Sequence, residues 1–128
     1  MVLLKRLRFI TLPLIMLCWA QAADSAPLKF AWLTDTHVGS PTGAADLQIV
    51  VHDIRENDSI SFVIVSGDIS ELDVGENLTL AKTILDSLNR PYYIIPGNHD
   101  TKWTSSGGGL FEQLWGADRF NVEMGEFR

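Results

Sequence analysis

Three short apolar runs divide the chain at nearly even intervals. They are Phe30–Leu33, Phe62–Val65 and Tyr92–Ile95, and each is almost unbroken. Short runs without a polar face are typical of strands in a parallel sheet that is covered on both faces. We therefore expect three such strands, and we expect Trp32, inside the first, to belong to the core.

The two segments between these runs carry apolar residues on one helical face. In the first segment the apolar stripe consists of Leu47, Val50, Val51 and Ile54. In the second segment it consists of Leu78, Ala81, Leu85 and Leu88. Residues spaced by three or four positions predict an amphipathic helix in each segment. Asp73, with Glu76 three residues later, predicts an N-terminal capping pair for the second helix.

The expected elements alternate as strand, helix, strand, helix, strand. Two right-handed crossovers in succession predict a parallel βαβαβ core and an α/β fold class. A third short helix is expected over Leu110–Trp115, ended by Gly116, and Phe120–Val122 is expected to begin a further strand. No linker or internal repeat interrupts the chain after Ala23, which predicts one domain.

The first residues have the pattern of a secretory signal. A basic start precedes an apolar run from Phe9 to Trp19, and Ala20-Gln21-Ala22 follows as a small-x-small cleavage site. The run is shorter than the ~20 residues that span a bilayer, so we expect no stable membrane span. We expect a signal peptide over 1–22, a domain over 23–128 and a periplasmic or secreted protein. Lipid modification at Cys18 is a weaker alternative, because bulky Leu17 precedes it.

The 128 residues carry a formal net charge of −6. Without the three basic residues of the leader, the remainder stands at −9. Such an acidic surface argues against nucleic acid or anionic membrane as a partner.

Polar clusters follow each of the three expected strands. They are Asp35-Thr36-His37, Gly67-Asp68 and Gly97-Asn98-His99-Asp100. Ligands of open α/β sheets bind beyond the carboxyl ends of the strands, so these clusters are expected to meet at one edge.

The residue types in these clusters suit a pair of metal ions. Asp35 and His37 are two residues apart, so in an extended backbone their side chains point to the same side and can hold one ion. Asp68 has two carboxylate oxygens and can bridge two ions, Asn98 offers an amide oxygen to the second, and His99 can donate a proton to a leaving group. Two such ions would activate water against a phosphate, and mixed oxygen and imidazole ligands suit manganese, iron or zinc, divalent or trivalent.

Across residues 28–100 these motifs resemble the calcineurin-like metallophosphoesterase family. The resemblance implies that Asp35 and His37 bind the first metal, Asp68 bridges, and Asn98 binds the second. It also implies that His99 acts near the leaving group and that Asp100 orients His99. The implied protein is a hydrolase of small phosphate esters, monoesters or diesters.

The same resemblance implies an α/β/β/α sandwich of which this chain is the N-terminal half. The family's later motifs supply three more histidines, and no histidine follows His99 in this chain. We therefore interpret the chain as a truncated phosphoesterase whose sheet has an exposed face, and we expect the 128-residue polypeptide alone to be poorly soluble and inactive.

Other interpretations remain open at this stage. Each motif taken alone is common in turns, and Glu71 either orients a ligand or receives a helix end. The alternative function is a non-catalytic remnant or binding module that holds at most one metal weakly.

The leader pattern gives a direct prediction. When the gene is expressed with secretion, mass spectrometry of the secreted protein should find Ala23 at the N-terminus. Ala22→Tyr should block cleavage, because the site needs a small residue there. A mature protein that begins at Met1, or at a lipid-modified Cys18, would contradict this prediction.

Overall fold

The computed structural model describes residues 27–71, 75–102 and 108–123. Three strands, β1 (Phe30–Leu33), β2 (Phe62–Ser66) and β3 (Tyr92–Ile95), form a parallel sheet in the order β1-β2-β3. The expected strands are confirmed, and β2 extends one residue further, to Ser66. The signal peptide and Asp73 lie outside the described residues, so the predictions made for them stay predictions.

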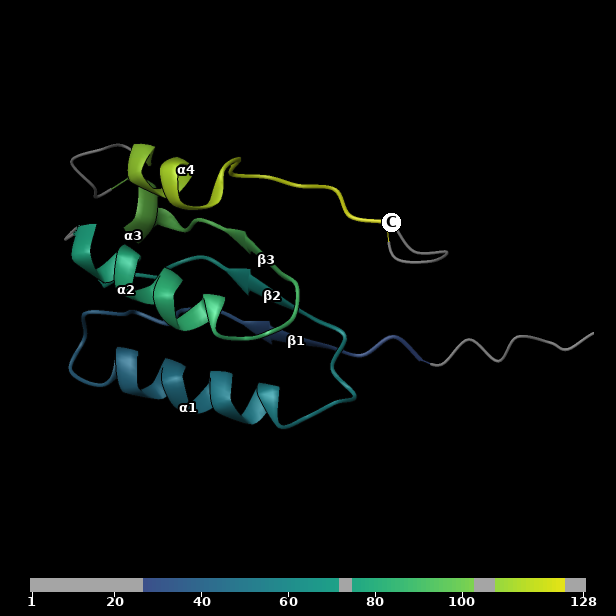
Figure 1. The fold of residues 1–128 in the computed structure, drawn as a ribbon. Coiled ribbons are helices and arrows are strands. Elements are labelled where there is room, and N and C mark those ends of the chain that lie inside the picture. The colour runs from purple at the N-terminus through teal and green to yellow at the C-terminus, as the bar shows by residue number, and fades with distance from the viewer. Residues whose placement is uncertain (1–26, 72–74, 103–107, 124–128) are drawn as a thin grey trace, which may run out of the picture.

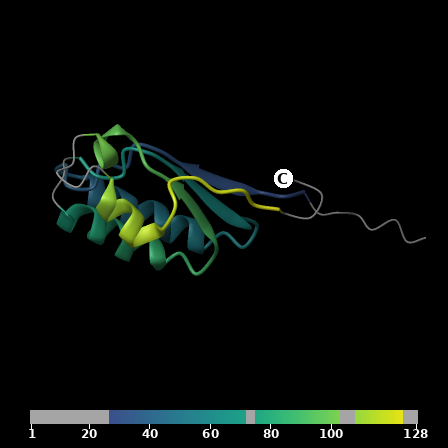
Figure 2. The ribbon, with the colours of Figure 1, turned by 90° about the horizontal axis from the view of Figure 1, so that it is seen from above.

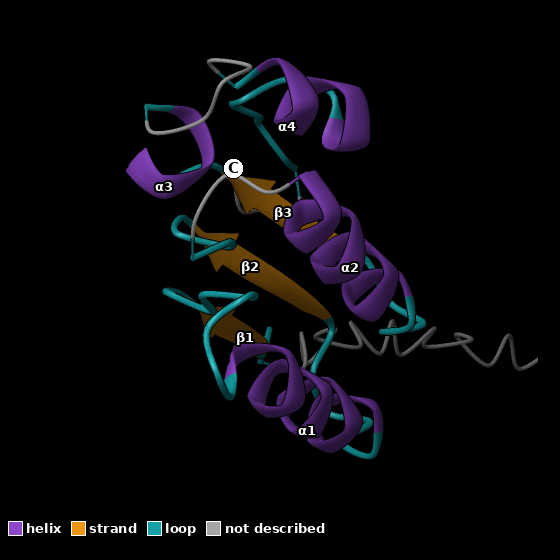
Figure 3. Ribbon diagram, turned by 90° about the vertical axis from the view of Figure 1, so that its left-hand side faces the viewer, coloured by secondary structure: helices purple, strands orange, loops and turns teal. Residues whose placement is uncertain are grey.

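Two long helices connect the strands and lie on the same side of the sheet. Helix α1 (Gly43–Arg55) follows β1, and α2 (Gly75–Asp86) follows β2 (Figures 1 and 3). This is the expected βαβαβ arrangement, and it is consistent with the N-terminal half of the sandwich that the resemblance implies. None of the helices in the described part of the chain is both long and apolar enough to cross a membrane.

The core lies between these helices and one face of the sheet. Val63 and Val65 of β2 are fully buried, and Ile94 of β3 is nearly so. Alternate residues of a strand point to opposite faces, so these three side chains share the face that the helices cover. Viewed from above, the helices form one layer and the strands the other (Figure 2).

Helix α1 buries a narrower stripe than its sequence predicts. Leu47, Val51 and Ile54 are buried, whereas Val50, also a member of the predicted apolar stripe, is 36% exposed. One sheet and one neighbouring helix cover only part of the circumference of α1. Gly43, in the first turn, is also buried, and a β-carbon there would lie 2.2 Å from the backbone oxygen of His37.

Helix α2 buries the residues that its sequence predicts. Leu78, Ala81 and Leu85 are at most 1% exposed, and Leu88, just beyond the helix, is fully buried. Leu88 keeps a helix-like backbone bond to Leu85 at 3.0 Å, which carries the apolar stripe past the last turn.

The other face of the sheet is open in the described part of the chain, as the half-sandwich interpretation expects. Trp32 is 67% exposed and Phe30 is 48% exposed, so the expectation that Trp32 belongs to the core is wrong. Phe62 is buried on this face, between the rings of Phe30 at 5.1 Å and Tyr93 at 5.9 Å. The unbroken apolar strands predicted a sheet covered on both faces, but α1 and α2 cover only one of them.

Two short helices complete the fold. Helix α4 (Gly109–Trp115) ends at Gly116, whose φ of 88° suits glycine, as the sequence predicts. Helix α3 (Asn98–Thr101) was not foreseen and stands directly after β3. The strand expected over Phe120–Val122 is wrong, because this segment has no strand pairing. It contacts β3 through a side chain instead: the Phe120 ring lies 5.3 Å from that of Tyr93.

A polar network joins α4 to α2 and β3. Trp115 donates to the Tyr92 hydroxyl at 3.0 Å, and Tyr92 donates to Asp86 at 2.6 Å. Burial, together with the hydrogen bond to Asp86, raises the pKa of the Tyr92 phenol. Lys82 holds both oxygens of Asp86 at 2.9 Å.

The burial pattern of α2 predicts unequal effects of two leucine substitutions. Leu85→Ala should lower the free energy of unfolding by about 2–5 kcal/mol, because it empties a fully buried site. Leu80→Ala, on the same helix and 42% exposed, should have a much smaller effect. Urea denaturation of both variants measures the difference, and equal losses would contradict the packing described for α2.

Candidate metal centre

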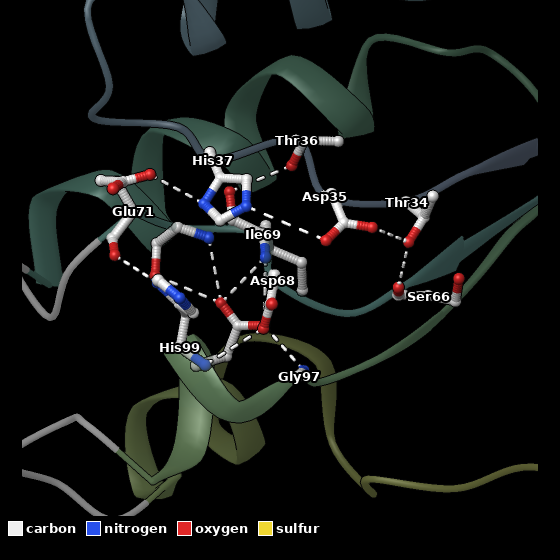
Figure 4. Close-up of polar contacts among 12 residues, drawn as sticks. Thr34, Asp35, Thr36, His37, Ser66, Asp68, Ile69, Glu71, Gly97 and His99 are labelled. Atoms are coloured by element: carbon white, nitrogen blue, oxygen red, sulfur yellow. Dashed lines mark hydrogen bonds and ion pairs between the residues drawn. The ribbon is translucent and has the colours of Figure 1, made fainter.

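The three polar clusters meet at the carboxyl edge of the sheet, as expected (Figure 4). Backbone pairing continues beyond the strands and fixes the loops against one another. Asp35 donates its N–H to Gly67 O at 3.1 Å, His37 to Asp68 O at 3.1 Å, and Gly67 to Ile95 O at 2.9 Å. The loops are therefore extensions of the sheet, which limits how far their side chains can move apart.

Asp35, His37 and Asp68 form a cluster with the character of a metal site. One ligand atom from each lies within 4.8 Å of the others. His37 Nε2 is 3.9 Å from Asp35 Oδ1, and their side chains are 30% and 60% exposed. Six ligands at ~2.1 Å from an ion are ~3–4.2 Å apart, so small side-chain rotations bring these atoms into range. Two carboxylates and an imidazole suit a divalent transition metal.

The backbone of this cluster is not extended, contrary to the reasoning that paired Asp35 with His37. Their φ angles are 54° and 42°, and Asp68 has a φ of 48°. All three residues thus occupy the left-handed region, which is uncommon for residues other than glycine. The side chains still converge, but through two sharp turns rather than through the alternation of a strand.

Two glycines make room for Asp68. A β-carbon on Gly97 would lie 2.1 Å from Asp68 Oδ1 and 2.3 Å from Asp68 N. A β-carbon on Gly67, whose φ is 76°, would lie 3.0 Å from the α-carbon of Gly97. The sequence indicated the turn at Gly67, but not the contact between the two loops that Gly97 permits.

Asn98 is exposed and lies at the start of α3. It lines an open cavity of about 220 Å³ together with Asp35 and Asp68. The structure thus brings this predicted second-metal ligand to the same hollow as two residues of the cluster, Asp35 and Asp68.

His99 stands beside the cluster. Its ring meets that of His37 edge to face, with 4.9 Å between centroids. Its backbone N–H donates to Asp68 Oδ1 at 3.1 Å, and its ring Nδ1 contacts the backbone carbonyl of Glu71. Because a carbonyl only accepts hydrogen bonds, Nδ1 carries the proton in the neutral ring, and Nε2 carries the lone pair.

Asp100 has partners other than the imidazole that the resemblance implied. Its fully buried carboxylate accepts hydrogen bonds from Ile69 N, from Ser70 N and Oγ, and from Gly97 N, at 2.8–3.2 Å. The expected orientation of His99 by Asp100 is therefore corrected: Asp100 joins the loops after β2 and β3, and the contact to His99 Nδ1 comes from Glu71.

Thr34 was missed by the sequence reasoning. Its hydroxyl lies 2.5 Å from Asp35 Oδ2 and 2.9 Å from Ser66 O, and it shares one proton between these acceptors. The available signal was a hydroxyl residue placed immediately before a candidate carboxylate ligand.

Comparison with known proteins agrees with this geometry. A family model described as calcineurin-like phosphoesterase matches residues 28–127. The glycerophosphodiester phosphodiesterase GpdQ of Enterobacter lignolyticus (strain SCF1) is 34% identical over 86 residues, which cover 59% of this chain. The matched part spans 30% of the length of that relative.

The contact between Gly97 and Asp68 predicts the effect of a single methyl group. Gly97→Ala should weaken Mn²⁺ binding by about tenfold or more, because the added carbon displaces the Asp68 carboxylate. Isothermal titration calorimetry measures the affinity. Gly116→Ala is the control for an added methyl group: Gly116 has a φ of 88°, unlike the −98° of Gly97, but nothing lies within 4 Å of the added carbon. It should cost stability and leave Mn²⁺ affinity unchanged, and undiminished binding by Gly97→Ala would contradict the arrangement.

Proposed function

The chain belongs to the calcineurin-like phosphoesterase family, and from this premise we propose that the complete gene product is a metal-dependent hydrolase of phosphate esters. The observation that carries the proposal is the convergence of Asp35, His37 and Asp68 at the carboxyl edge of the sheet. Carboxylate and imidazole groups gathered at a strand edge support metal-assisted hydrolysis, because a phosphate ester needs both charge neutralisation and an activated water.

We propose a centre of two metal ions. Asp35 and His37 would hold the first ion, Asp68 would contribute to both ions, and Asn98 would hold the second through its amide oxygen. Ions in these positions would polarise the phosphate and activate the attacking water. The chain spans 30% of the length of the relative that it matches, and we propose that the remaining ligands come from a longer gene product.

The protein's own groups have separate tasks in this proposal. In its imidazolium form, His99 would give the Nε2 proton to the leaving oxygen and become the neutral ring with the proton on Nδ1, which contacts the Glu71 carbonyl. Asp68 Oδ1 also accepts the backbone N–H of His99, so ligand and proton donor keep a fixed spacing. The Asp100 carboxylate holds the loops that carry both.

Within the phosphate esters, we propose phosphodiesters as the substrate class. The similar protein named above is a glycerophosphodiester phosphodiesterase, which favours phosphodiesters as the first class to test. We also propose export to the periplasm or the medium, from the leader pattern in residues 1–22.

One observation favours a second function. The described metal cluster has three ligand residues, which is enough to hold one ion but not two. A module that binds one metal without catalysis is therefore the alternative, and it predicts metal binding with no hydrolysis.

Activity measurements separate the two proposals. The complete gene product should hydrolyse bis(p-nitrophenyl) phosphate, lose this activity with a chelator and regain it with Mn²⁺. His99→Ala should lower kcat by about 10²–10⁴-fold with metal still bound, because it removes the proton donor. His52→Ala, on the exposed side of α1, is the control and should leave kcat unchanged. A folded, metal-loaded protein without turnover on either diesters or monoesters would contradict the hydrolase proposal.

A further inference from the structure

Glu71 contacts both histidines of the site. Its carboxylate Oε2 is 2.8 Å from His37 Nδ1. Its backbone carbonyl contacts His99 Nδ1. Figure 4 shows Glu71 at the edge of the cluster, beside both rings.

The backbone fixes the position of Glu71. Its N–H donates to Val38 O at 3.0 Å, and Val38 donates to Ile69 O at 2.8 Å. Val38 is fully buried and directly follows His37 in the chain. Glu71 and His37 are therefore held on adjacent backbone segments, which keeps their side chains close to each other.

The contact between Glu71 and His37 determines which ring nitrogen can bind a metal. His37 Nδ1 is buried and forms no hydrogen bond, so its 2.8 Å contact with the Glu71 carboxylate is electrostatic. A carboxylate oxygen repels a bare nitrogen lone pair, and the Glu71 oxygen is nearer to Nδ1, at 2.8 Å, than Asp35 Oδ1 is to Nε2, at 3.9 Å, so Nδ1 carries the proton. The lone pair is then on Nε2, which is the atom that faces Asp35 Oδ1.

We propose that Glu71 is a positioning residue for the metal ligand His37. Its carboxylate holds the imidazole in the tautomer whose Nε2 lone pair faces the Asp35–Asp68 side of the cluster. The same residue, through its backbone carbonyl, holds His99 in the corresponding tautomer. The inference rests on the proposed function only in taking His37 as a ligand, because the tautomer belongs to the metal-free protein.

The two contacts of Glu71 provide an internal control. A substitution at position 71 removes the carboxylate from His37 but leaves a backbone carbonyl for His99. Histidine side-chain ¹⁵N NMR, recorded in alkaline buffer that deprotonates a free imidazole, reports the two tautomers separately. In Glu71→Ala the His37 signals should shift toward those of a mixed tautomer, whereas the His99 signals should stay close to wild type.

Metal affinity gives the second readout. Glu71→Ala should weaken Mn²⁺ binding by the complete gene product about 10–100-fold by calorimetry, as loss of a residue that orients a ligand does. Glu71→Gln keeps an oxygen acceptor and the side-chain volume, so it should restore much of the affinity. Glu112→Gln, exposed on α4, is the control for loss of one negative charge and should bind as wild type does.

The outcomes are distinguishable. An unchanged His37 tautomer in Glu71→Ala overturns the inference, and so does an equal change at both histidines, which would mean that the loop has loosened. If the wild type binds no Mn²⁺, the proposed function fails, and the NMR comparison still decides whether Glu71 sets the His37 tautomer.

Discussion

The buried carboxylate of Asp100 joins the loop after β2 to the loop after β3, and the site depends on this connection. Two backbone N–H groups from Ile69 and Ser70 and one from Gly97 converge on it. Hydrogen bonds to a charged group are worth about 1.5–3 kcal/mol each, and a buried N–H without a partner costs a comparable amount. No neutral side chain of this size accepts as many bonds. Asp68 lies immediately before the first of these donors, so its position follows from that of Asp100.

A second constraint is the conformation of the candidate ligands themselves. Asp35, His37 and Asp68 all have positive φ, which costs of order 1–3 kcal/mol at each residue. Backbone hydrogen bonds from both sides of each turn, and the fully buried Val38 between them, hold this conformation in place. Backbone strain of this kind is concentrated at functional sites, where side chains must point in particular directions. Here a relaxed loop would let the ligand side chains point apart. Bringing two carboxylates and an imidazole together therefore lowers the stability of the fold.

The sequence predicts the scaffold better than it predicts the site. Strands and helices follow from periodicity. An apolar stripe such as Leu78, Ala81 and Leu85 predicts a helix that packs this face against the sheet, as α2 does. Periodicity does not show how many other elements cover a given face of a helix or strand. For this reason the exposure of Val50 and Trp32 could not be predicted. The strand expected over Phe120–Val122 fails for a similar reason, since an apolar segment can contact a sheet through rings alone.

At the site, the sequence identifies residue types but not their partners. The cluster of Asp35, His37 and Asp68 is predicted, because parallel strands end at one edge. Its left-handed backbone, the space kept by Gly97 and the partners of Asp100 depend on contacts between residues about 30 positions apart. Such contacts leave no local pattern, and Glu71 illustrates this: its double contact with His37 and His99 is visible only in three dimensions.

The central claim is that this edge of the sheet binds metal through Asp35, His37 and Asp68. Anomalous X-ray diffraction from crystals of the complete gene product grown with Mn²⁺ tests it most directly. The account predicts an anomalous peak at ~2.0–2.3 Å from one atom of each of the three residues, and a second peak ~3.5–4 Å away beside Asn98. Ordered crystals that hold Mn²⁺ only at other places, or that leave this edge without an anomalous peak, would contradict it.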